Sequence, residues 1–265
     1  EILNTFDEQV GHNASIARLS QAIASGDKIK VRRLTPDEGA ALAIYVPAAA
    51  LMSQTSDDVS AVYFVLALAL DPELHVARSL WAQSLSNAER WDEAIGVLAR
   101  VPETSAFYAT SRGQIAWALQ RSGRSQSALA VAAEALDHSP DRGLQIQIAD
   151  LYRAVGRQEQ AEALLTEIIR DDASHKREDW RLFYARGVSR GELGDWPEGE
   201  RDLLKALALQ PDDASLLNYV GYSYVDRGEH LDFAMDMIRR AAEMEPNEGY
   251  IIDSLGWAHY RLGGY

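Results

Sequence analysis

Cysteine is absent from the 265-residue chain. Its absence excludes disulfide bonds, thiolate nucleophiles and sulfur-ligated metal sites, while leaving the redox compartment open. Long apolar runs are missing too, since the longest candidate, AVYFVLALAL from Ala61, is far shorter than the roughly 20 residues that a membrane-spanning helix needs. We therefore expect this segment to be a buried helix of a folded domain.

Positive charge is scarce: 26 Lys and Arg stand against 40 Asp and Glu, a formal net charge of −14. This excess repels nucleic-acid phosphates and anionic lipid surfaces, so the sequence predicts no nucleic-acid partner and favours basic protein partners. The basic run at Lys28, Lys30, Arg32 and Arg33 is interpreted as a solvated connector, with a binding patch as the alternative.

Motifs for catalysis, cofactors or metals are also missing. The six histidines form no HExxH motif and no i, i+4 pair, and no glycine-rich phosphate loop occurs. Acidic pairs such as Asp171-Asp172 and Asp212-Asp213 stand beside turns and helix starts, where the helix dipole favours negative charge. The sequence therefore predicts a protein that is not an enzyme, with no cofactor, no metal site and no catalytic residue.

An internal repeat is what the chain does carry. At a spacing of about 34 residues, a small residue in one helix, a Gly at a turn, an Ala in the next helix and often a Pro recur seven times. We expect each register to open a helix pair, and the registers begin near Ala41, His75, Phe107, Arg142, Trp180, Ala214 and Gly249.

The most regular unit shows why small residues and Pro recur at these positions. Gly221 stands inside the first helix, Gly228 ends it, and Ala234 and Pro246 follow in and after the second helix. Small residues allow two helix backbones to approach, and Pro stops the hairpin. In the preceding unit, Gly199 stands where the packed Ala is expected.

This pattern resembles that of the tetratricopeptide repeat (TPR) proteins, from about residue 40 to residue 265. The resemblance implies an all-α fold, a right-handed α-solenoid of stacked helix-turn-helix repeats. We expect about six and a half repeats over residues 35–265, the last of them truncated. Residues 1–34 form an N-terminal helix and connector, or a decayed repeat. Thr35 is a predicted N-cap, with Pro36 in the first turn and Glu38 completing a capping box.

The resemblance also implies a binding surface, because TPR proteins usually bind partners along the concave wall of their first helices. Aromatic side chains beside Asn and Arg suit the recognition of a peptide or partner protein, although Tyr and Trp also serve inter-repeat packing. Counting one face of each first helix gives this predicted groove: Trp117, Gln120, Arg121, Arg153, Arg181, Tyr184, Asn218, Tyr222, Asp226, Asp253, Trp257, Tyr260 and Arg261.

Some TPR grooves bind chain-terminal carboxylates with Lys, Asn and Arg on successive first helices. Here Asn218 and Arg181 have no matching Lys, which disfavours such a ligand. The stretch from Phe183 to Tyr265 is similar to TPR proteins and lipoproteins of proteobacterial cell envelopes. That similarity implies a periplasmic or envelope location, with the cytoplasm as the alternative, and a scaffold or adaptor whose partner is an envelope protease or enzyme.

The sequence therefore favours a non-catalytic interaction scaffold. One alternative is the regulatory or substrate-recruiting arm of a larger enzyme. Another is a self-assembling architectural rod, a homo-oligomer formed through the open last repeat, where we expect Leu255, Trp257 and Leu262 to stay partly uncovered.

Overall fold

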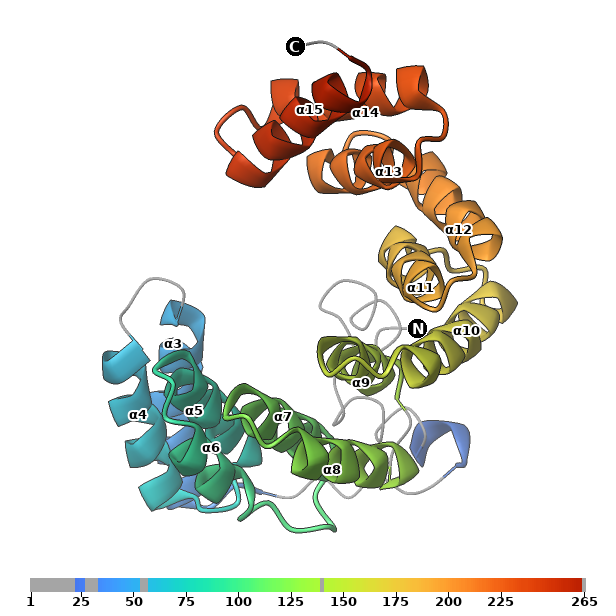
Figure 1. The fold of residues 1–265 in the computed structure, drawn as a ribbon. Coiled ribbons are helices and arrows are strands. Elements are labelled where there is room, and N and C mark those ends of the chain that lie inside the picture. The colour runs from blue at the N-terminus through green and yellow to red at the C-terminus, as the bar shows by residue number, and fades with distance from the viewer. Residues whose placement is uncertain (1–21, 27–32, 53–56, 139–140, 264–265) are drawn as a thin grey trace. The chain divides into compact units, whose positions relative to one another are not determined.

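The computed structural model describes residues 22–26, 33–52, 57–138 and 141–263 (Figure 1). Regular structure in these ranges is helical, which confirms the all-α class. Most of the predicted N-terminal helix and most of the basic connector lie outside the described residues, although residues 22–24 are helical. The helices are α3 (Pro36–Leu51), α4 (Asp57–Leu70), α5 (His75–Asn87), α6 (Trp91–Leu98), α7 (Tyr108–Arg121), α8 (Ser125–His138), α9 (Arg142–Ala154), α10 (Gln158–Ser174), α11 (Trp180–Glu192), α12 (Trp196–Leu209), α13 (Ala214–Arg227), α14 (Leu231–Met244) and α15 (Gly249–Arg261).

Helix starts agree with the predicted registers. Five first helices begin at the expected residue, α7 begins one residue after Phe107, and α3 begins before Ala41, at Pro36. The capping box explains the early start of α3: the Thr35 hydroxyl accepts a hydrogen bond from the Glu38 amide at 3.3 Å, and the Glu38 carboxylate accepts one from the Thr35 amide at 2.7 Å. Asp213 caps α13 in a similar way, accepting from the Leu216 amide at 2.9 Å.

Turn residues connect the helices of each pair. Gly194 and Gly228 have φ angles of 84° and 73°, in the left-handed region that costs a residue with a Cβ atom roughly 1 kcal/mol or more. The short turns at these glycines make α11–α12 and α13–α14 helical hairpins, as the predicted repeat requires. The chain divides into two compact units, Glu1–Leu151 and Tyr152–Tyr265.

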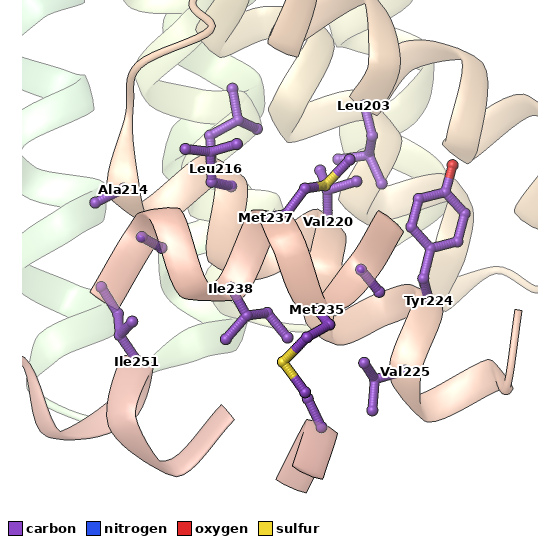
Figure 2. Packing of buried hydrophobic residues seen from close by; sticks show 14 of the residues in the cluster. Leu203, Ala214, Leu216, Val220, Tyr224, Val225, Met235, Met237, Ile238 and Ile251 are labelled. Carbon is purple, nitrogen blue, oxygen red and sulfur yellow. The ribbon is translucent and has the colours of Figure 1, made fainter. Parts of the chain in front are cut away.

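A continuous apolar core joins α11 to α15 of the second unit (Figure 2). Leu203 comes from α12, Val220 from α13, Ile238 from α14 and Ile251 from α15, and each is at most 1% exposed. Because the cluster takes side chains from five successive helices, α11 to α15, neighbouring hairpins share one core.

Backbone contact at small residues holds the α11–α12 and α13–α14 hairpins together. A Cβ atom built on Gly187 lies 2.9 Å from the carbonyl oxygen of Gly199, and one built on Gly199 lies 2.9 Å from that of Gly187. A Cβ atom on Gly221 lies 2.9 Å from the carbonyl oxygen of Ala234 and 2.7 Å from Cγ1 of Ile238. Larger residues at these positions must push the two helices apart.

The charged network between α10, α11 and α12 is a second link between repeats. Arg186 binds both carboxylate oxygens of Asp202 at 2.7 Å, and Arg190 binds Asp202 at 2.9 Å and Glu162 at 2.8 Å. Arg186 also donates to the hydroxyl of Thr166 at 3.2 Å. The Asp202 side chain is only 7% exposed, so its charge depends on both guanidinium groups.

One expectation is wrong. The apolar segment from Ala61 was predicted to be a buried helix, yet α4 buries only one side, through Ser60, Phe64, Ala67 and Leu68. Its other side is exposed, because α3 and α5 cover one face of the helix and no described element covers the opposite one.

Replacing Gly221 with Ala tests the backbone contact. We expect Gly221→Ala to lower the free energy of unfolding by about 1–3 kcal/mol, because the methyl group meets the backbone of α14. Gly256 is the matched control: it follows Gly221 by the 35-residue offset that also joins Ser215 to Tyr250, and a Cβ atom there meets nothing within 4 Å. Gly256→Ala should be neutral or stabilising by up to about 1 kcal/mol. Equal effects in urea unfolding curves would contradict the contact model.

Replacing Asp202 with Asn tests the charged network. We expect a loss of about 2–4 kcal/mol in the free energy of unfolding, because Arg186 and Arg190 lose a largely buried counter-charge. The control is Glu178→Gln, which removes an exposed ion pair with Lys205 at 2.7 Å and should cost less than about 1 kcal/mol. Urea unfolding measures both, and similar values for the two variants would show that the network is not a structural link.

Candidate functional site

First helices of successive hairpins are joined by side-chain contacts in the first unit. The hydroxyl of Ser79 on α5 donates to Oε1 of Gln114 on α7 at 2.6 Å. The indole Nε1 of Trp117 on α7 donates to the backbone carbonyl of Gln147 on α9 at 3.2 Å. Residues about one repeat apart thus face each other, and α5, α7 and α9 form one wall.

A hollow of about 540 Å³ opens along this wall. Such a volume is within the range of small-ligand and peptide-side-chain sites. Most of its lining comes from the C-terminal halves of α5 and α7, with Gln147 from α9. The lining residues are Ala82, Gln83, Ser86, Asn87, Glu89, Trp91, Leu98, Thr110, Gln114, Trp117, Ala118, Arg121 and Gln147.

Carboxamide groups dominate the polar part of this hollow. Gln83 donates to Asn87 at 2.9 Å, which leaves Oε1 of Gln83 and a hydrogen of the Asn87 amide for other partners. Gln114 is engaged by Ser79. The side chain of Gln147 makes no hydrogen bond within the described part of the chain. Each carboxamide pairs a donor with an acceptor and so matches a peptide group in an extended chain.

Trp117 and Arg121 lie together at the hollow. The Arg121 guanidinium is 5.9 Å from the centre of the Trp117 ring, within cation–π range, and Arg121 is exposed while Trp117 is half-buried. Both were predicted groove residues. Gln120, from the same helix, does not line the hollow, and its buried Oε1 has no partner among the described residues.

Aromatic side chains form the corresponding surface of the second unit. The Tyr184 ring lies edge-on to Tyr219 at 5.3 Å and 6.4 Å from Trp180. Burial raises the pKa of Tyr184 and of Tyr219, and the positive charge of Arg153 opposes that rise at both phenols. Sequence reasoning missed Tyr219, although its spacing from Tyr184 matches the repeat and was a usable signal.

At the end of this surface, α15 carries a second aromatic group and meets α13 through Arg261. Trp257 and Tyr260 stack with ring centres 5.4 Å apart, and the Arg261 guanidinium is 5.7 Å from the Trp257 ring. Arg261 also donates to the backbone carbonyl of Asp226 at 3.0 Å. Tyr222 on α13 is exposed. Three predicted residues are thus brought together, with Arg261 fixed by the preceding repeat.

The remaining predicted residues divide into exposed and buried positions. Arg181 is exposed and lies over the Trp180 ring at 5.1 Å, and Asp253 is exposed on α15. Asn218 is only 6% exposed, and its Oδ1 has no hydrogen-bond partner among the described residues. Its side chain therefore packs inside the second unit, between α13 and its neighbours, instead of lying on the surface.

No helix in the described ranges combines the length and apolar character needed to cross a membrane. In the same ranges, no cluster of three His, Asp or Glu side chains is arranged to hold a metal ion.

Trp117 and Arg121 should differ in their effect on stability. We expect Trp117→Ala to lower the free energy of unfolding by about 2–4 kcal/mol, because a half-buried ring and its bond to Gln147 are lost. Arg121→Ala should cost less than about 1 kcal/mol, the value of an exposed cation–π contact. Urea unfolding of both variants measures the difference. A large loss for Arg121→Ala would show that this side chain holds the wall and is not available for a partner.

Solved structures share the fold. The chain superimposes on a chain of the crystal structure of the APC/C hetero-tetramer Cut9-Hcn1 with a TM-score of 0.61 at 14% identity, covering 97% of this chain and 51% of that one. A tetratricopeptide repeat protein from Parabacteroides merdae gives a TM-score of 0.60 at 13% identity, covering 97% and 95% of the two chains. At these identities the similarity concerns the fold alone.

Curated proteins are similar over shorter stretches. The TPR repeat-containing protein PA4667 of Pseudomonas aeruginosa is 29% identical over 145 residues, which is 55% of this chain and 24% of that protein. The lipoprotein NlpI homolog of Haemophilus influenzae is 37% identical over 84 residues, 32% of this chain and 26% of that protein. The chain thus spans about a quarter of the length of these relatives, and no protein-family profile matches it. The repeats and these similarities show that the chain has the tetratricopeptide repeat fold.

Proposed function

We propose that this protein is a non-catalytic scaffold that binds an extended segment of a partner protein along its first helices. The TPR fold supports protein–protein interaction in general. The observation that carries the specific proposal is the hollow on α5, α7 and α9. There, carboxamides of Gln83, Asn87 and Gln147 face the same space as Trp117 and Arg121.

The chemistry of this hollow suits a peptide backbone. Carboxamides donate to and accept from peptide groups independently of the peptide sequence. The Trp117 ring offers a rigid apolar surface, and Arg121 offers a charged donor beside it. The second unit has a separate aromatic surface, where Tyr222, Trp257 and Tyr260 are exposed.

We further propose that the scaffold acts in the bacterial cell envelope as a tethering adaptor. Support comes from its 37% identity, over 84 residues, with a protein named as a lipoprotein. An envelope protease or another envelope enzyme is the partner class that this proposal predicts. Detecting the protein in periplasmic and membrane fractions, and not in the cytosol, tests the location.

Variants with altered carboxamides test the peptide proposal. Envelope extract is passed over the wild type and over the variant Gln83→Ala/Arg121→Ala/Gln147→Ala, and retained proteins are identified by mass spectrometry. A fluorescent peptide from the retained partner is then titrated against both. We expect at least about a tenfold weaker affinity for the variant, since several hydrogen bonds of about 0.5–1.5 kcal/mol each are lost.

The matched control is Gln126→Ala, which removes an exposed carboxamide from the second helix α8. This control should bind as the wild type does. Unchanged affinity for the triple variant would overturn the proposal for this hollow. Loss with Tyr222→Ala/Trp257→Ala alone would move the site to the second unit.

A further inference from the structure

The helix α4 has two apolar faces, and the neighbouring helices α3 and α5 cover one of them. Phe64, Ala67 and Leu68 are buried against neighbouring helices. The opposite side carries an exposed apolar stripe in which each side chain is 36–59% exposed. We call it the α4 stripe, and it consists of Val59, Val62, Tyr63, Val65, Leu66 and Leu70.

The spacing of the α4 stripe makes it one continuous surface. Val59, Val62, Leu66 and Leu70 follow one another at three- or four-residue steps, and Tyr63 lies four residues after Val59 and three before Leu66. All five therefore align along one side of the helix. A helix that is apolar all round is usually buried on all sides, whereas a surface helix has a polar outer face. The sequence of α4 therefore fits a helix that is covered by something more than its own hairpin.

An apolar hollow of about 360 Å³ adjoins the stripe. It lies between α3 and α4 and is lined by Ala43, Ile44, Pro47, Ala48, Val59, Ser60 and Tyr63. This hollow gives the surface a shape into which large apolar side chains fit.

From this surface we infer that two copies of the chain associate as a twofold dimer, with α4 packed against α4 of the second copy. No charged residue occurs from Val59 to Leu70 in α4 or from Gly39 to Leu51 in α3. In a chain with a net charge of −14, this is a place where two copies meet with little repulsion. An apolar stripe along a helix is also self-complementary under a twofold rotation.

Other occupants fit the stripe less well. Interfacial membrane helices carry Lys and Arg beside their apolar face, but α4 has none and Asp71 follows it directly. A basic partner would have no acidic side chain to bind between Val59 and Leu70.

The area of the stripe fits a weak dimer. The six stripe side chains, at about half exposure, offer on the order of 500 Å² per copy. A pair of copies therefore buries about 1,000 Å², the lower limit for a specific interface. The expected dimer is therefore in equilibrium with monomer.

Sedimentation velocity of the full 265-residue chain over a concentration series tests the dimer. We expect a concentration-dependent dimer for the wild type. In Val62→Glu/Leu66→Glu, the dissociation constant should rise at least about a hundredfold, because unpaired charges enter an apolar interface. The control Leu204→Glu places a charge at a leucine of α12 that is exposed to a similar degree, and it should leave the dimer unchanged.

Crosslinking gives a second readout that does not depend on the glutamate variant folding well. Because these 265 residues contain no cysteine, Val62→Cys and Leu204→Cys each carry a single thiol. A short bis-maleimide should crosslink two copies through position 62 and not through position 204. A wild type that sediments as a monomer at every concentration would overturn the inference, as would equal crosslinking at both positions.

Discussion

The close approach of two helix backbones in the α11–α12 and α13–α14 hairpins is the constraint on which the core of the second unit depends. At Gly187, Gly199 and Gly221 there is no room for a further carbon atom, because a backbone carbonyl of the partner helix lies 2.9 Å from the Cβ position. This contact sets the distance between the helices, and large residues such as Leu203 and Ile238 then fill the space around it. Because the same packing recurs in successive hairpins, small and large residues recur in the sequence about every 34 residues.

Stacking hairpins of one geometry brings equivalent side chains of neighbouring repeats together. Ser79 reaches Gln114, Tyr184 packs on Tyr219, and Arg261 binds the carbonyl of Asp226. A surface of first helices thus arises without any motif for it in the local sequence. The polar hollow beside Trp117 and the aromatic surface around Trp257 are two chemically different parts of this arrangement, each within its own compact unit.

The packing of the helices decides which apolar and charged side chains are buried, more than the composition of each helix does. Asp202 lies in a nearly buried position, where Arg186 and Arg190 from the neighbouring helix bind its side chain. Conversely, α4 is strongly apolar and yet leaves the side of Val62 and Leu66 exposed. Composition alone predicts the opposite for both, since it records neither the ion partners nor the number of neighbours that a helix receives.

The sequence by itself determined the helix class, the repeat, the helix starts from His75 onward and the cap at Thr35, because these depend on local contacts that recur at a fixed period. It also placed Trp117 and Arg121 on one helix face. Only the tertiary structure decided that Asn218 is buried, that Tyr219 joins the aromatic surface and that Gln83, Asn87 and Gln147 share a hollow. The physical reason is that exposure and proximity depend on how neighbouring hairpins pack, and side chains from several helices set that packing together.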